Sequence, residues 1–82
     1  MPKLRNLSGK KLVSIFESFG FAVLSQKGSH IKMFRFNLGE KQILVIPNHL
    51  SIAKGTLKAI YNQAVQYIAE EKIKKRFLFL NP

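Results

Sequence analysis

The chain has 82 residues, 46% of them hydrophobic and seven of them Phe, which predicts one folded domain over residues 1–82 and argues against disorder. It contains no cysteine, so disulfide frameworks and cysteine-based zinc sites are excluded. Fourteen Lys and Arg against four Asp and Glu give a net charge of +10, which favours a polyanionic partner, with nucleic acid first and an acidic protein second.

The amino terminus and the apolar runs indicate a soluble protein. The opening residues MPKLRNLSGKK contain no apolar segment of the kind that signal peptides carry. The longest unbroken apolar run, residues 43–47, is too short to span a bilayer. We therefore expect a cytoplasmic protein without a membrane partner.

A first amphipathic helix is predicted to begin after Ser8, which is a good N-cap residue. Leu7 and Leu12 stand at the positions of a hydrophobic staple, and Gly20 stands where a helix-ending glycine is expected. Four apolar residues recur with the helical period at i, i+3, i+4 and i+7: Leu12, Ile15, Phe16 and Phe19.

Lys10 and Lys11 fall in the first turn of this helix, where the helix dipole disfavours cations. Two interpretations remain open. Either both lysines are solvated at a small cost, or they face the phosphate backbone of a nucleic acid.

Three strands are predicted next, at residues 21–27, 30–37 and 42–46, joined by turns at Gly28-Ser29 and at residues 38–41. Such short turns imply an antiparallel meander. The third run has no polar alternation, so we expect it to be buried on both faces, in the centre of the sheet or under a helix. Pro47 is expected to end it, because proline cannot donate to the ladder.

A second helix is predicted after the loop PNHLSIAKGT, and it either runs past Ala69 or breaks near residues 65–67 and restarts. The basic residues between positions 72 and 76 suit a helix carboxyl terminus. The tail FLFLNP is expected to pack on the protein's own core or on a partner. The order helix, three strands, helix predicts a two-layer α+β fold with the helices on one face of a three-stranded antiparallel sheet. The apolar stripe of the second helix consists of Leu57, Ile60, Tyr61, Ala64 and Ile68.

The available side chains limit the chemistry. The four acidic residues are spread over the first helix, a turn and a late helix, so they are not expected to converge on metal ions. The chain has no Asp, which excludes a Ser-His-Asp triad. RNA carries its own nucleophile, the 2′-hydroxyl group, and needs only a proton acceptor and cations beside its phosphate.

His30, with Lys27 and Lys32 close in sequence, supplies these two requirements. The alternative is a structural histidine that only forms hydrogen bonds. Gly28 has two compatible roles, since it can supply a positive φ for the turn and can let an RNA backbone approach closely.

Three segments carry a resemblance to a known family: LSGKKLVSIFESFGF, then KGSH, then VIPNHLSIAKGTLKAIYNQA. In this order they resemble the HicA family of bacterial toxins, also called YcfA-like, which are small mRNA interferases of type II toxin–antitoxin pairs. The resemblance spans residues 7–65. Residues 66–82 depart from the family pattern as a helical and apolar carboxy-terminal extension.

The resemblance implies a double-stranded-RNA-binding-domain-like α-β-β-β-α fold and a metal-independent endoribonuclease that cleaves mRNA and arrests growth, without a cofactor. It implies His30 as the catalytic residue and places His49 at the family's second, more variable histidine. It also implies a phosphate site at the amino end of the second helix, although Thr56 could instead cap that helix. The residues expected to contact RNA are Lys10, Lys11, Lys27, Gly28, Ser29, Lys32, Lys54 and Thr56.

The partners implied by the resemblance are RNA and a HicB-like antitoxin, with oligomers forming through the antitoxin. Two other functions compete with this interpretation. One is a non-catalytic RNA-binding module, and the other is a regulatory protein that binds only an acidic partner.

Overall fold

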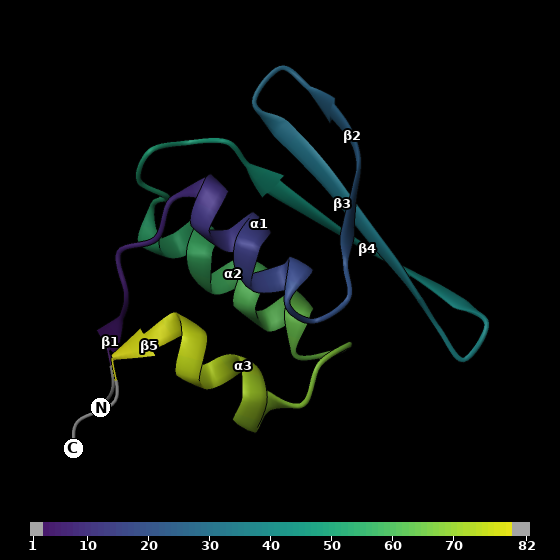
Figure 1. Cartoon of the computed structure of the whole chain (residues 1–82). Coiled ribbons are helices and arrows are strands. Elements are labelled where there is room, and N and C mark those ends of the chain that lie inside the picture. The colour runs from purple at the N-terminus through teal and green to yellow at the C-terminus, as the bar shows by residue number, and fades with distance from the viewer. Residues whose placement is uncertain (1–2, 80–82) are drawn as a thin grey trace.

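The computed structural model describes residues 3–79 (Figure 1). Three strands and two helices follow the predicted order, which confirms the α+β class. A third helix and a pair of two-residue strands complete the described part of the chain. Residues 1–2 of the amino-terminal segment and residues 80–82 of the apolar tail lie outside it. The elements are β1 (Lys3–Leu4), α1 (Gly9–Glu17), β2 (Ala22–Lys27), β3 (His30–Asn37), β4 (Glu40–Pro47), α2 (Lys54–Ala64), α3 (Glu70–Phe77) and β5 (Leu78–Phe79).

Helix α1 begins and ends as its sequence predicts. The Oγ of Ser8 accepts a hydrogen bond of 3.0 Å from the backbone N–H of Lys11, which confirms the N-cap. Gly20 has φ +93°. Beside it, the N–H of Phe21 donates to the carbonyl oxygen of Phe16 at 3.0 Å. This bond is the mark of a Schellman ending, and the two phenylalanine rings pack 5.9 Å apart across it.

The sheet is an antiparallel meander with strand order β2-β3-β4. Its turns are both two residues long, Gly28-Ser29 and Leu38-Gly39. The third strand does lie under helices, which is one of the two positions expected for it, but the expectation that it is buried on both faces is wrong. β4 is an edge strand, and only one of its faces meets the helices, so Val45 on the other face is 42% exposed. Pro47 ends the strand as predicted.

Helices α1 and α2 cover one face of the sheet, and α3 packs against them from the side away from the strands (Figure 1). The buried side chains form one cluster beneath these helices. Its fully buried members come from every main element except β2: Leu12, Ile15, Phe16, Met33, Leu44, Ile46, Leu57, Ala64, Ile73 and Phe77.

The helical segment after Ala64 breaks and restarts, which is the second of the two predicted alternatives. Helix α3 carries Glu70 and Glu71 in its first turn and three basic residues in its last turn, as the helix dipole favours. Tyr61 Oη on α2 donates to Glu70 Oε2 at 2.8 Å. Burial, together with this carboxylate, raises the pKa of Tyr61 to about 12.

The start of the apolar tail packs on the protein's own core. Phe77 is fully buried, with its ring 6.0 Å from that of Phe16. Leu78 then pairs with Leu4 in a short antiparallel β1–β5 ladder. The two ends of the described chain therefore lie side by side (Figure 1).

Arg35 ties three parts of the fold together from the helix-covered face of β3. Its guanidinium donates to Gln42 Oε1 at 2.7 Å, to the carbonyl oxygen of Phe19 at 2.8 Å and to that of Tyr67 at 2.7 Å. It also lies 4.8 Å from the ring centroid of Phe21. The planar, multiply donating guanidinium suits this task, because one side chain satisfies acceptors on β4, after α1 and after α2.

No helix within residues 3–79 is long and apolar enough to cross a membrane.

Candidate functional site

His30 is the first residue of β3 and is exposed. It closes the tight turn Gly28-Ser29, and its partner across the hairpin is Lys27. Gly28 has φ +56°, and a Cβ built on it would meet no atom within 4 Å. The backbone conformation, and not crowding, is therefore what requires glycine here.

The turn before His30 is braced by the loop that follows β4. The N–H of Asn48 donates to the carbonyl oxygen of Ser29 at 2.6 Å. One residue later, the carbonyl oxygen of His49 accepts from the N–H of Gly9 at 2.8 Å. This loop thus joins the turn that carries His30 to the first residue of α1.

Gly9 permits this close contact. A Cβ at Gly9 would collide with the carbonyl oxygen of Pro47 and would lie 2.8 Å from the Cα of Asn48. Since backbone atoms cannot move aside as a side chain can, only glycine fits. The amino terminus of α1, the loop after β4 and the His30 turn are consequently fixed relative to one another.

The charges beside His30 are positive. Lys27 and Lys32 share its face of the sheet, because Lys27 is its cross-strand partner and Lys32 follows two residues along β3. The acidic residues lie elsewhere, on α1, at the start of β4 and in the first turn of α3. Within residues 3–79, no group of three His, Cys, Asp or Glu side chains gathers.

Lys10 and Lys11 are exposed in the first turn of α1. Lys10 borders a shallow hollow of about 220 Å³ between α1 and the sheet, and Asn48 and Ile31 border it too. The structure therefore brings Lys10 to the braced turn, while Ser29 and Gly28 form the turn itself.

Lys54 and Thr56 are placed differently from the other predicted residues. The ammonium of Lys54 donates to the carbonyl oxygen of Leu4 at 2.8 Å and to Asn6 Oδ1 at 2.9 Å. It therefore holds the segment before α1. The alternative in which Thr56 caps α2 is wrong, because the N-cap position belongs to Ala53 and no side chain caps this helix.

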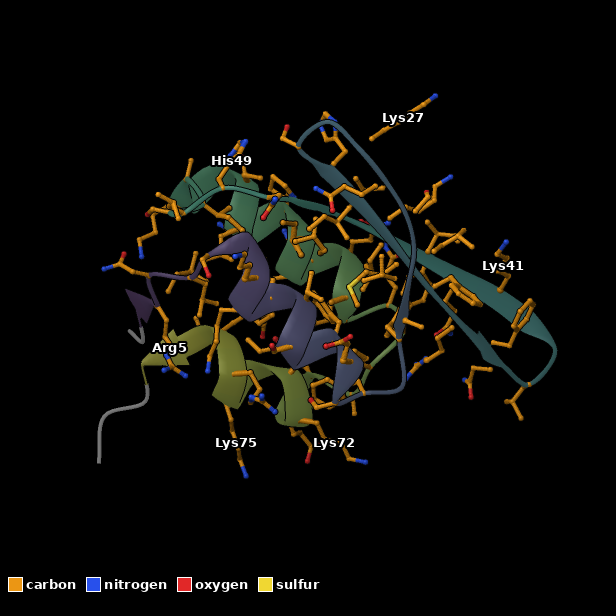
Figure 2. The ribbon with its side chains drawn as sticks, turned by 45° about the horizontal axis from the view of Figure 1, so that its top comes forward. Arg5, Lys27, Lys41, His49, Lys72 and Lys75 are labelled. Atoms are coloured by element: carbon orange, nitrogen blue, oxygen red, sulfur yellow. The ribbon has the colours of Figure 1, made fainter. Side chains whose placement is uncertain are left out.

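His49 is exposed in the loop after β4, and its side chain points outward (Figure 2). Figure 2 also shows Lys27 projecting from the β2–β3 turn on the side opposite Lys72 and Lys75 of α3. Lys27 beside His30 is thus separated from the lysines of α3 by the body of the molecule.

Two contributors to the site were not predicted, Gly9 and Asn48. The available signal for Gly9 was its place at the start of a helix, where its poor helix propensity needs a reason. Asn48 acts through its backbone N–H, which no residue pattern reveals. Together with His30 they yield an exposed imidazole beside ammonium groups, which can move a proton next to a phosphate.

Comparison with known proteins gives one match. The family model for the HicA toxin of bacterial toxin–antitoxin systems matches residues 9–65, from the first residue of α1 to the end of α2. Searches of the curated proteins and of the solved structures return no significant match. The match includes Gly9, the braced turn with His30 and the loop with Asn48, and it covers more than half of the chain. The chain therefore belongs to the HicA family of toxins of bacterial toxin–antitoxin systems.

Proposed function

We propose that the protein is an endoribonuclease that cleaves mRNA and arrests growth, with His30 as its catalytic residue. The observation that carries this proposal is the position of His30. It is exposed at the end of a sheet face with Lys27 opposite it. Its turn is fastened to the body of the protein through Asn48. A residue that only supported the fold would need no such exposure.

The proposed reaction uses the nucleophile that RNA already carries. The imidazole of His30 takes the proton of the 2′-hydroxyl group, and the 2′-oxygen attacks the adjacent phosphorus. The bond from phosphorus to the 5′-oxygen breaks, and that oxygen takes a proton from water as it leaves. The products are a 2′,3′-cyclic phosphate and a free 5′-hydroxyl. The ammonium groups of Lys27 and Lys32 stabilise the negative charge that builds on the phosphoryl oxygens.

The other residues predicted to contact RNA differ in how freely they can reach a phosphate. Lys10 and Lys11 can meet the backbone from the first turn of α1, and Lys10 borders the same hollow as Asn48, whose N–H braces the turn. Lys54 has two of its ammonium donors engaged by the chain itself and can offer one to a phosphate. Thr56 and His49 are exposed and lie close to Lys54 in sequence, and we assign them only secondary RNA contacts. The α-β-β-β-α order supports a double-stranded-RNA-binding-domain-like fold.

We propose that a HicB-like antitoxin holds the enzyme inactive and that oligomers form through this antitoxin. Membership of a toxin–antitoxin family supports such a partner. The net charge of +10 favours an acidic one. A specific complex should bury more than about 1,200 Å² in total and cover His30. The compartment in which both would act is the cytoplasm.

The test is to express His30→Ala without an antitoxin and to follow growth, RNA integrity and melting temperature. Cleavage should fall about 10²–10⁴-fold, the range of a general base. The free energy of unfolding should stay within about 0.5 kcal/mol, because the side chain is exposed. A variant that still arrests growth would remove His30 from the mechanism, and one that unfolds would make it a structural residue.

The same assay tests the chemistry. The parent protein should cut RNA but not DNA, with EDTA present, and should leave 2′,3′-cyclic or 3′-phosphate ends. A strict Mg²⁺ requirement, or products with 5′-phosphates, would contradict attack by the 2′-hydroxyl group. If parent and variant both bind RNA and neither cuts it, the protein is a binding module.

A further inference from the structure

The face of the sheet that the helices leave uncovered, here called the open face, carries aromatic and basic side chains. The register places His30, Lys32, Phe34 and Phe36 on it along β3. Lys41 and Val45 stand on the same face of β4, opposite Phe36 and Lys32. This face is continuous from His30 to the tip of the β3–β4 hairpin.

Two phenylalanine rings stand on this face toward the tip of the β3–β4 hairpin. Phe36 is 65% exposed, and Phe34 is half-buried beside it. Their ring centroids lie 6.0 Å apart at 83°, an edge-to-face pair. Lys41 Nζ lies 5.7 Å from the ring centroid of Phe34, which is within cation–π range. The rings are therefore ordered by each other and by a lysine, while Phe36 remains open to solvent.

We infer that the open face is a stacking platform for single-stranded RNA that leads the chain to His30. Bases stack on exposed aromatic rings whatever their sequence, because every base has a π-face. In a duplex those faces are covered by neighbouring bases, so the fitting substrate is unpaired RNA. This inference rests on the proposed cleavage at His30 and adds the class of substrate to it.

Charge complementarity selects RNA as the occupant. The titratable side chains that the register puts on the open face are basic: Lys27, His30, Lys32 and Lys41. None of the four acidic residues takes an open-face position within the sheet register, since Glu40 alternates with Lys41 and the others lie on helices.

Strand β3 places the stacking platform and His30 on one continuous face. Phe36 and His30 are six residues apart on one strand and on one face, which is about 20 Å at the usual rise per residue. Lys32 lies between them. A strand of RNA that stacks at Phe36 can thus run over cationic side chains to the imidazole.

The test measures RNA affinity in the full-length His30→Ala protein, so that the RNA stays intact. The probes are a single-stranded oligoribonucleotide, an abasic chain with the same number of phosphates, and an RNA duplex. Phe36→Ala should weaken binding of the single strand about tenfold, within the usual range for one stacked base. It should leave binding of the abasic chain and of the duplex unchanged. The matched control is Leu38→Ala, which removes a 99% exposed apolar side chain from the tip of the same hairpin and should change none of the three affinities.

An equal loss for the single strand and the abasic chain would overturn stacking. So would unchanged RNA binding by Phe36→Ala combined with loss of its complex with the antitoxin, since the open face would then be a protein surface. The melting temperature of Phe36→Ala should match that of Leu38→Ala. Cleavage by the parent protein separates the two proposals. If the parent cuts RNA and Phe36 has no effect on affinity, the platform is wrong and the nuclease stands. If base-dependent binding needs Phe36 but the parent never cuts, the platform stands without the nuclease.

Discussion

The two faces of the sheet differ although they alternate along the same strands. On β3, Ile31 and Met33 are buried beneath the helices, whereas His30 and Lys32, which alternate with them, are exposed. The covered face meets α1 and α2 and contributes to the one buried cluster. The open face contributes the proposed chemistry. A period of two residues therefore separates the side chains that build the core from those that we propose act on RNA.

This separation predicts that stability and activity can be changed independently. Substitutions on the covered face should alter the free energy of unfolding, and substitutions on the open face should alter RNA binding or cleavage. Substitutions in the loop with Asn48 should affect both stability and cleavage, because this loop joins the amino terminus of α1 to the turn that carries His30.

The largest effect on stability is expected from Met33→Ala. This side chain is fully buried, so its removal should cost about 2–5 kcal/mol through lost burial and a residual cavity. The control is its neighbour, Lys32→Ala, which should cost no more than about 0.5 kcal/mol and yet reduce cleavage. Urea unfolding and RNA cleavage per folded molecule check both. Similar unfolding free energies for the two variants would mean that the faces are not separable.

A smaller loss, together with reduced cleavage, is expected from Gly9→Ala. The added methyl group meets the backbone of Pro47 and Asn48, and overpacking of this kind costs about 1–3 kcal/mol. Because Asn48 braces the His30 turn, cleavage per folded molecule should fall as well. Gly55→Ala is the matched control, since a Cβ there meets nothing within 4 Å, and it should be neutral or stabilising by up to about 1 kcal/mol. Full activity in folded Gly9→Ala would show that the brace does not position His30.

The smallest effect is expected in the salt dependence of RNA binding, measured in the His30→Ala protein. For single-stranded RNA, the logarithm of the binding constant falls linearly with the logarithm of the salt concentration. Replacing Lys27 and Lys32 by Gln should make this slope less steep by about 1.4, which is the value for two phosphate contacts. Replacing Lys72 and Lys75 of α3 removes the same charge from the other side of the molecule (Figure 2) and should leave the slope nearly unchanged.

Equal slope changes for the two pairs would mean that net charge, and not the open face, governs binding. The same measurement on a variant with Gln at positions 10 and 11 decides between the two interpretations of Lys10 and Lys11. If they contact phosphates, the slope falls. If they are only solvated, it does not.

The features that the sequence predicted correctly are those with local causes. Ser8 caps α1 three residues before its donor, and Gly20 and Phe21 end that helix against Phe16. The Gly28-Ser29 turn also follows from neighbouring residues, whereas the sequence left open whether the helix breaks after Ala64, since no Gly or Pro lies there. For the candidate site, the sequence predicted the Gly28-Ser29 turn with His30 directly after it, because glycine and serine favour tight turns.

The features that were missed depend on contacts between distant segments. The acceptors of Arg35 at Phe19 and Tyr67 lie 16 and 32 residues away, and the crowding at Gly9 comes from Pro47. The apolar run in β4 suggested burial on both faces, but in the fold Val45 lies on the open face, where no helix covers it. Hydrophobic pattern shows that a strand has a buried face, and it does not show how many neighbours the strand has.

The position of α3 has a consequence for how the protein folds as it is being synthesised. The family match ends at residue 65, but Ile73 and Phe77 are fully buried beyond it, and Tyr67 supplies the last acceptor of Arg35. A nascent chain that stops at residue 65 thus has its proposed catalytic turn but an open core. At the usual pace of about 5–20 residues per second, roughly 0.6 to 2.4 seconds of translation separate that point from Phe77. During this interval we expect the emerging chain to be incompletely folded, so that its core closes only once Phe77 has been added.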